Sequence, residues 1–375
     1  MKRVFFFVLL SGGLLLMLLK FLPLSWMQRI PLPLPERFIE FWRPEILPVE
    51  TLHVLPPDPV VLDRPRPKWQ GAIQHQKQLV SVYKFGPIQA RQENIKINYV
   101  NHLAAGDTFI AATDVYDKKV LIFTPELKFL RKWAMFSGVA SMMKAPIALA
   151  AYQNEVAALD RNGSLVIWNP EGKIQASFKI KGRARDLVFL NHDEILVEQT
   201  KPYPYLLVVY KRNGRMLRRF APFPQKNPEE ALYLNEAYVD ISPGGLIALG
   251  FIYPYRLLYY TSGGKPVKAI EINPVFSVHP PTFHRQEGKI VRMYRQSIIY
   301  DVHWFQGFLY VLIASEQAKA ASYMDVFTSD GEFIERFYLP INVLKMTSHN
   351  NLLYFLGYWP DYRIEAYKIK KFSPN

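Results

Sequence analysis

Three aspartates occupy similar places in three short apolar segments of the chain. Asp186 lies in ARDLVFL, Asp240 in AYVDIS and Asp301 in SIIYDVHWF. Carboxylate oxygens are the ligands that Ca²⁺ and Mg²⁺ prefer in proteins. If the three segments converge in the fold, the chain holds the donor set for a divalent cation or for a metal-dependent hydrolase or lyase.

Other residue types restrict the chemistry. The chain has no cysteine, which excludes disulfides, thiolate metal sites and cysteine nucleophiles. His279 and His284 flank a Pro-Pro pair, which is typical of a loop, and the HExxH spacing of a helical zinc site is missing. No G-x-S-x-G elbow, P-loop or Rossmann fingerprint occurs. We therefore expect no catalytic residue and no cofactor, with a channel Ca²⁺ on the three aspartates as the alternative.

A repeated β-hairpin pattern must supply the elements that position the aspartates. Residues 323–340, YMDVFTSDGEFIERFYLP, alternate apolar and polar residues on both sides of a turn that ends in glycine. Similar patterns recur from residue 95 to the end of the chain, with turns near residues 126, 171, 213, 263 and 330. Each unit holds four short strands, and a repeated unit of this kind is typical of propeller blades.

These repeats predict an all-β fold, a six-bladed β-propeller of four-stranded blades over residues 71–375. The sixth unit lacks an outer strand, whereas Leu79–Phe85 is a strand without a unit. Because open edges of a ring must pair, we expect 79–85 to close the last blade. The innermost strand of each blade would line a central channel, which Asp186, Asp240 and Asp301 would enter from three adjacent blades.

Two stretches resemble a known family of propellers. Asp114–Phe123, DVYDKKVLIF, and Leu159–Ile174, LDRNGSLVIWNPEGKI, look like the repeats of NHL and TolB-like six-bladed propellers. The resemblance implies that an aspartate of an innermost strand often hydrogen-bonds the neighbouring blade, which is a structural alternative for the three aspartates. Some six-bladed lactonases and lyases hold a metal in the channel, so the resemblance also keeps the enzymatic alternative open.

The amino-terminal sequence predicts a membrane anchor followed by a linker. Lys2 and Arg3 precede a long apolar stretch without an Ala-x-Ala cleavage site. We expect residues 1–29 to form an uncleaved signal anchor, with a cleaved signal peptide as the alternative. The chain would then cross the cytoplasmic membrane once, with the propeller on the periplasmic or extracellular side. Residues 30–70 are rich in proline and predict an extended linker. Its apolar residues would pack on the folded domain, lie in the membrane interface or wrap a partner.

Three loops combine tyrosine or tryptophan with proline and a basic residue: TKPYPY at 200–205, IYPYR at 252–256 and YWPDYR at 358–363. In a propeller these loops share one face with the two longest connections between blades, 221–236 and 273–297, and residues 289–300 would add a strand or short helix there. Aromatic residues and arginine are enriched in protein interfaces, which favours a binding face over simple capping of blade edges. The predicted partner-binding residues are Lys201, Tyr203, Tyr205, Tyr253, Tyr255, Arg256, Trp359, Tyr362 and Arg363.

The bulk composition agrees with a binding role. The 375 residues carry a net charge of +14, which favours anionic neighbours, and no nucleic-acid recognition motif is present. We interpret the chain as a non-catalytic, membrane-anchored, extracytoplasmic propeller. It would serve as a scaffolding subunit that binds another membrane or periplasmic protein. The alternatives are the metal-dependent hydrolase or lyase and a receptor for an anionic cell-wall polymer.

Overall fold

Short runs of alternating apolar residues form the strands of this protein. In the computed structural model, for example, β13 (Glu194–Gln199) pairs antiparallel with β14 (Tyr205–Lys211), with Glu194 opposite Lys211 and Val197 opposite Val208. The β-branched and aromatic side chains of such strands suit a pleated surface that is buried on both faces. The structure describes residues 50–62 except 53, 77–134 except 96 and 98, 145–200, 204–223, 227–314 except 275, 320–358 and 361–371.

Four sheets consist of consecutive strands, two of them with one added strand. The first holds β4 (Val100–Ala105), β5 (Ile110–Asp114), β6 (Lys119–Phe123) and β7 (Phe129–Ala134). The second holds β8 (Pro146–Tyr152), β9 (Glu155–Asp160), β10 (Ser164–Trp168) and β11 (Ile174–Lys179). The third holds β12 (Ala184–Phe189), β13, β14, β15 (Met216–Pro222) and the added β1 (Glu50–Thr51). The fourth holds β16 (Ala237–Ile241), β17 (Leu246–Phe251), β18 (Arg256–Thr261), β19 (Pro266–Ile272) and the added β2 (Val60–Leu62).

A fifth sheet has seven strands, and a separate hairpin stands beside the sheets. The seven strands are β22 (Ile299–Phe305), β23 (Phe308–Ala314), β24 (Ala321–Phe327), β25 (Phe333–His349), β26 (Leu352–Gly357), β27 (Arg363–Lys371) and β3 (Lys77–Phe85). The hairpin consists of β20 (Thr282–Gln286) and β21 (Lys289–Tyr294). Two short helices, α5 (Pro87–Gln92) and α6 (Pro228–Leu234), lie in connections between sheets.

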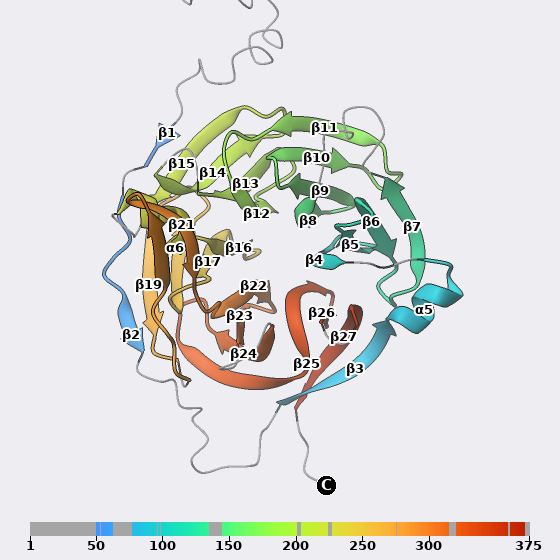
Figure 1. The fold of residues 1–375 in the computed structure, drawn as a ribbon. Helices are drawn as coiled ribbons and strands as arrows, with labels where there is room; N and C mark the ends of the chain where they lie inside the picture. Colours follow the sequence, from blue (N-terminus) through green and yellow to red (C-terminus); the bar gives the residue numbers. More distant parts are fainter. Residues whose placement is uncertain are drawn as a thin grey trace, which may run out of the picture. The chain divides into compact units, whose positions relative to one another are not determined.

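The sheets stand around a central axis, which makes the fold an all-β propeller (Figure 1). The inner strands contact one another in order, β4 with β8, β8 with β12, β12 with β16, β16 with β22 and β22 with β25. Contacts between β25 and β4 then close the ring. β3, which includes the predicted closing strand 79–85, pairs antiparallel with β27, with Phe85 opposite Ile364.

The predicted set of six separate four-stranded blades is wrong. Four sheets stand as individual blades, and the residues assigned to the fifth and sixth units form the continuous seven-stranded sheet. The reason lies in β25, which has 17 residues and stays extended where we expected a connection. Its middle, Leu339–Asn342, has no glycine, and Pro340 falls where the ladder of β24 and β25 is interrupted. Proline lacks a backbone donor and is tolerated at such a gap.

The linker also contributes strands. β1 pairs parallel with β15, with Glu50 opposite Arg218, and β2 pairs parallel with β19, with Val60 opposite Ile270. Both segments lie in the range 30–70, for which an extended linker was predicted. They add a fifth strand to the outer edges of two neighbouring blades.

The predicted membrane helix is not found in the part of the chain that the structure describes. The helices α5 and α6 have six and seven residues, and no helix among the described residues is long and apolar enough to span a bilayer. Residues 1–29, for which the anchor was predicted, lie outside the described residues. This finding corrects the predicted single-pass location in the cytoplasmic membrane, which we do not retain.

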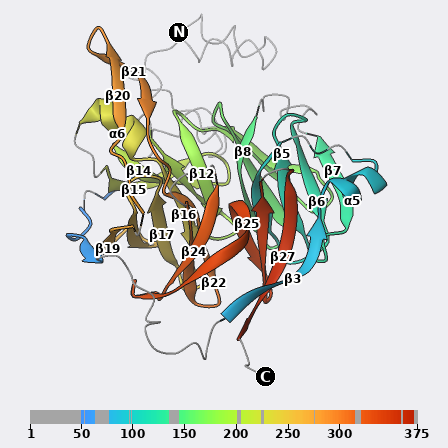
Figure 2. The same cartoon turned by 60° about the horizontal axis from the view of Figure 1, so that its bottom comes forward.

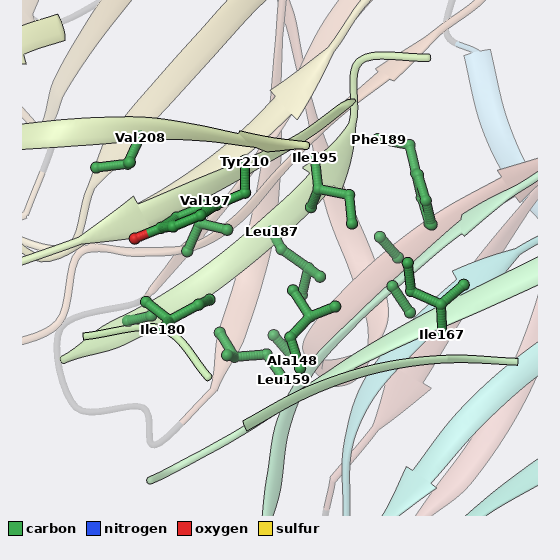
Figure 3. Packing of buried hydrophobic residues seen from close by; sticks show 14 of the residues in the cluster. Ala148, Leu159, Ile167, Ile180, Leu187, Phe189, Ile195, Val197, Val208 and Tyr210 are labelled. Carbon is green, nitrogen blue, oxygen red and sulfur yellow. The ribbon is translucent and has the colours of Figure 1, made fainter. Parts of the chain in front are cut away.

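The core consists of apolar layers between neighbouring sheets. Figure 3 shows the layer between the second and third sheets, where Ala148, Leu159 and Ile167 meet Leu187 and Val197. Small alanines on one sheet face larger side chains on the next, which fills the wedge between them. This packing holds the inner strands close enough for their side chains to meet across the channel.

Candidate functional site

The channel contains a cavity of about 530 Å³ at one end of the inner strands. Its wall is formed by residues of β4, β8, β12, β16, β22 and β25, and by Ser242, Pro243 and Gly245 in the turn after β16. We call this space the channel cavity. It lies at the end where each inner strand turns into its second strand, whereas α6 and the β20–β21 hairpin lie in connections that enter the inner strands from the other end.

Each predicted channel aspartate accepts a backbone N–H from the next inner strand. The bonds run from Val239 to Asp186 Oδ2 at 3.1 Å, from Trp304 to Asp240 Oδ2 at 2.8 Å and from Met346 to Asp301 Oδ2 at 2.9 Å. The free edge of an inner strand has unpaired N–H groups, and a buried N–H needs an acceptor. The carboxylates therefore join neighbouring inner strands in sequence.

Basic side chains take the remaining carboxylate oxygens of two of these aspartates. Lys345 Nζ lies 2.9 Å from Asp301 Oδ1, and His102 Nε2 lies 3.3 Å from Asp186 Oδ1. Lys345 Nζ also stands 3.7 Å from the centre of the Tyr238 ring. Burial opposes the charged ammonium, but the carboxylates of Asp301 and Asp186 raise the pKa of Lys345 above its ordinary value.

This arrangement bears on the divalent-cation hypothesis. Among the described residues, no group of three or more histidine, cysteine, aspartate or glutamate side chains is gathered as a metal site would require. Lys345 supplies a positive charge beside Asp301 from within the protein. Groups of the protein itself thus donate hydrogen bonds to the carboxylates of Asp186, Asp240 and Asp301.

Asp240 is connected to a different set of side chains. Its Oδ2 lies 2.8 Å from His303 Nδ1, and His303 Nε2 lies 2.8 Å from Ser348 Oγ. Burial opposes the charged imidazole, but the carboxylate of Asp240 raises the pKa of His303 above its ordinary value. Sequence analysis did not predict this group, because its members come from β16, β22 and β25 and have no local spacing.

The opposite end of the inner strands carries the predicted binding loops, and we call it the loop face. Of the described residues it comprises 252–255, 358, 361 and 362, helix α6 and the β20–β21 hairpin. Lys201, Tyr203 and Trp359 belong to the predicted set but lie outside the described residues. Figure 2 shows α6 and the hairpin side by side at this end.

Two of the predicted binding tyrosines are core residues. Tyr205 is 3% exposed and Tyr255 is 1% exposed, so neither is available on the surface as predicted. Tyr255 instead donates a hydrogen bond to Asp325 Oδ2 at 2.7 Å, across the boundary between two sheets. Tyr253 is half-buried, and Arg256 forms an ion pair of 2.6 Å with Glu271.

Tyr362 belongs to a cluster of four tyrosines on the loop face. The ring centres of Tyr99 and Tyr362 are 5.4 Å apart, as are those of Tyr99 and Tyr116, and Tyr358 stands 5.5 Å from Tyr362. Tyr116 is 72% exposed. Arg363, also predicted, lies 3.0 Å from Glu365. The aromatic character expected for this face is present, although two of its members, Tyr99 and Tyr116, come from loops that we did not single out.

Three arginines share a single glutamate, Glu236, directly before β16. Arg183 lies 2.6 Å from Glu236 Oε1, Arg185 lies 2.8 Å from Glu236 Oε2, and Arg295 pairs with the same Oε2. Burial opposes the charged carboxylate, but Arg185, Arg295 and Arg183 hold the pKa of Glu236 below its ordinary value. One carboxylate cannot neutralise three guanidinium groups, so the cluster carries excess positive charge.

Comparisons with known proteins give only a remote likeness. No protein-family model and no curated protein matched the sequence. Among solved structures, the chain is similar to the crystal structure of the Cps50 (Swd1) β-propeller domain of Myceliophteria thermophila, with 11% sequence identity and a TM-score of 0.47. The match covers 78% of this chain and 100% of that domain. We base no argument on a likeness of this level, and the propeller fold rests on the sheets described above.

Proposed function

We propose that this chain is a protein-binding scaffold whose loop face docks on an acidic surface of a partner protein. The observation that carries the proposal is the β20–β21 hairpin. Its two strands pair with each other and with no other strand that the structure describes. Propellers serve many unrelated functions, so the role must be argued from this face rather than from the fold.

The hairpin offers charge and apolar surface together. Most of its side chains are exposed, including Lys289 and Arg292, and Val291 is 59% and Tyr294 is 47% exposed. Arg292 stacks over the Tyr294 ring at 4.5 Å. Arginine and tyrosine dominate the energetically important positions of protein interfaces. An acidic partner would meet complementary charge here.

The base of the hairpin is held on the propeller. Phe283 of β20 packs edge-on against Tyr233 of α6, with ring centres 6.4 Å apart. Nearer the turn of the hairpin, Arg285 also pairs with Glu230 of α6 at 3.4 Å. A hairpin that is fixed at its base loses less conformational entropy on binding than a free loop would, which favours a preformed docking surface.

The arginine cluster adjoins this surface, since Arg295 donates a hydrogen bond to the backbone carbonyl of Tyr233 in α6. Arg183 is half exposed, with a side-chain exposure of 53%. Tyr116, in the tyrosine cluster, is also exposed. The net charge of the whole chain, +14, has the same sign as these groups. The resemblance of Asp114–Phe123 and Leu159–Ile174 to NHL and TolB-like repeats stays a prediction, and the proposal does not depend on it.

The test compares two charge-reversed variants of the full chain. The variant Lys289→Glu/Arg292→Glu changes the hairpin, and Lys173→Glu/Lys265→Glu makes the same change in net charge at exposed turns of the opposite end. Each tagged chain is purified from its native source, and retained proteins are quantified by mass spectrometry. The partner is then expressed, and its affinity for each chain is measured at two salt concentrations.

We expect one partner to be retained by the wild type and by the turn variant, but not by the hairpin variant. The partner should bind the hairpin variant at least about tenfold more weakly than the wild type at low salt. The difference should be smaller at about 0.3 M salt, because salt screens surface charges. Equal loss in both double variants would indicate bulk charge and contradict the proposal. Binding of isolated anionic polymer by the hairpin, without any protein partner, would also contradict it.

A further inference from the structure

Ser348, His303 and Asp240 meet in the wall of the channel cavity. The Ser348 hydroxyl and the His303 ring are joined at Nε2 by a 2.8 Å contact, and the ring reaches Asp240 Oδ2 through Nδ1 at 2.8 Å. The three residues lie on β25, β22 and β16 and all line the cavity. They stand at the end of the inner strands opposite the loop face.

These contacts define the roles that the three groups can take. Asp240 accepts the proton of Nδ1, which leaves the lone pair of Nε2 directed at the Ser348 hydroxyl in the neutral imidazole. The Asp240 carboxylate is itself fixed, since its Oδ2 accepts the backbone N–H of Trp304 at 2.8 Å. A serine, a histidine and an aspartate in this order form the relay that activates a hydroxyl for nucleophilic attack, whatever fold carries it.

We propose that Ser348 is a nucleophile for acyl transfer from small esters, with His303 as its general base and Asp240 as the positioning residue. In the first step, Ser348 Oγ forms a bond to the ester carbonyl carbon while its proton passes to His303 Nε2. The tetrahedral intermediate expels the alcohol, which takes that proton, and leaves an acyl group on Ser348. Water then attacks the acyl carbon while His303 takes its proton, and this proton passes to Ser348 Oγ as the carboxylic acid leaves.

The backbone of β25 supplies a donor for the intermediate. Met346 N–H points to the free edge of β25, where it donates to Asp301. Because alternate residues of a strand direct their N–H groups to the same edge, Ser348 N–H also points to the channel. A backbone N–H of the nucleophile itself is a suitable donor to the oxyanion.

The cavity has the size for such a substrate. Its volume of about 530 Å³ lies within the range of small-molecule sites. The carboxylates next to Ser348 disfavour an anionic substrate, which points to neutral esters.

A fluorophosphonate probe tests the proposal on the folded full chain, because it labels only an activated serine. We expect one probe per chain, attached to Ser348 by peptide mapping, and none on Ser348→Ala. The matched control is Ser262→Ala, whose serine lines the same cavity but is not the serine that contacts His303. His303→Gln should label at least about 100-fold more slowly, since it lacks the general base.

Asp240 needs a readout that a purely structural role would not move. Asp240 on β16 and Asp301 on β22 are the carboxylates that raise the pKa of His303, and Ser348 faces the ring from β25. In Asp240→Asn the pH at which labelling is half-maximal should therefore fall, in addition to a slower rate. Near-UV circular dichroism shows that each variant is folded.

Three results would overturn the proposal. They are no labelling of the folded wild-type chain, labelling that persists in Ser348→Ala, or a labelling rate of His303→Gln equal to that of the wild type. Any of them would make His303 a bridge between inner strands. Since the hairpin variant of the loop face leaves this cavity untouched, its outcome is independent of the probe result.

Discussion

Replacement of Lys345 by methionine tests how the channel is held together. The side chain is buried, and its ammonium lies 2.9 Å from Asp301 and 3.7 Å from the centre of the Tyr238 ring. Methionine has a similar length but no charge, so Lys345→Met would leave the buried carboxylate of Asp301 without its cation. Removing one partner of a buried ion pair costs about 3–5 kcal/mol.

The loss is measured by thermal and urea unfolding. For a folded unit of this size, 1 kcal/mol corresponds to about 2 °C in Tm, so we expect Tm to fall by roughly 6–10 °C. The matched control is the double variant Lys345→Met/Asp301→Asn, in which the carboxylate charge is removed as well. Its amide oxygen can still accept the Met346 N–H, and replacement of both charges of a buried pair is often nearly neutral. We therefore expect most of the loss to be recovered.

Two outcomes would refute this reasoning. A single variant within about 1 kcal/mol of the wild type would mean that water or another group solvates Asp301. A double variant as unstable as the single one would mean that the lysine stabilises through its contact with Tyr238 rather than through charge. A metal titration of Lys345→Met gives a further check, since the carboxylate of Asp301 would then lack its cation.

Two further predictions concern buried charge. Asp325, which is fully buried, accepts two hydrogen bonds from Arg336 at 2.6 and 2.8 Å and one from Tyr255. Asp325→Ala should cost about 3–5 kcal/mol and Tyr255→Phe only about 1 kcal/mol, measured by urea unfolding, because the first leaves a guanidinium unpaired and the second removes one neutral donor. The raised pKa of His303 means that its interaction with Asp240 contributes stability fully below the unfolded pKa of about 6.5, and that this contribution is lost as pH rises through the folded pKa. In His303→Gln, stability should fall less steeply as pH rises above about 6.5. An unchanged dependence of stability on pH would contradict an ion pair between His303 and Asp240.

The strands could be predicted from the sequence because their signals are local. Alternation and turn glycines such as Gly331 mark a hairpin within about 15 residues, and Gly331 indeed has a positive φ of 76°. The division into blades could not be predicted in the same way. We expected a connection at residues 341–342, but the chain stays extended there between segments of β25 that pair with β24 and β26. The strands β1 and β2 were missed because short parallel pairs with distant outer strands leave no periodicity in the linker.

The candidate sites show the same division between local signals, which could be predicted, and contacts with other strands, which could not. The three aspartates were found because each occupies a like position in a repeated strand, but their partners, such as Lys345 and the N–H of Trp304, come from the next strand of the ring. Tyr255 was assigned to the surface because tyrosine beside proline in a loop suggests exposure. Its hydroxyl instead finds a carboxylate in the core. Burial of a single loop residue depends on the neighbouring sheet, which the local sequence does not encode.

A line of contacts runs between the two proposed sites. Arg185 donates to the Tyr238 hydroxyl at 3.2 Å, the Tyr238 ring faces Lys345 Nζ at 3.7 Å, and Lys345 pairs with Asp301, which lines the channel cavity. Arg185 lies at the end of this line toward the loop face, and Asp301 lies at the end toward the cavity. This arrangement fits the proposed neutral ester in the cavity and the proposed acidic partner at the loop face. If Lys345 sets this division, Lys345→Met should alter probe labelling in the cavity and leave partner affinity at the hairpin unchanged.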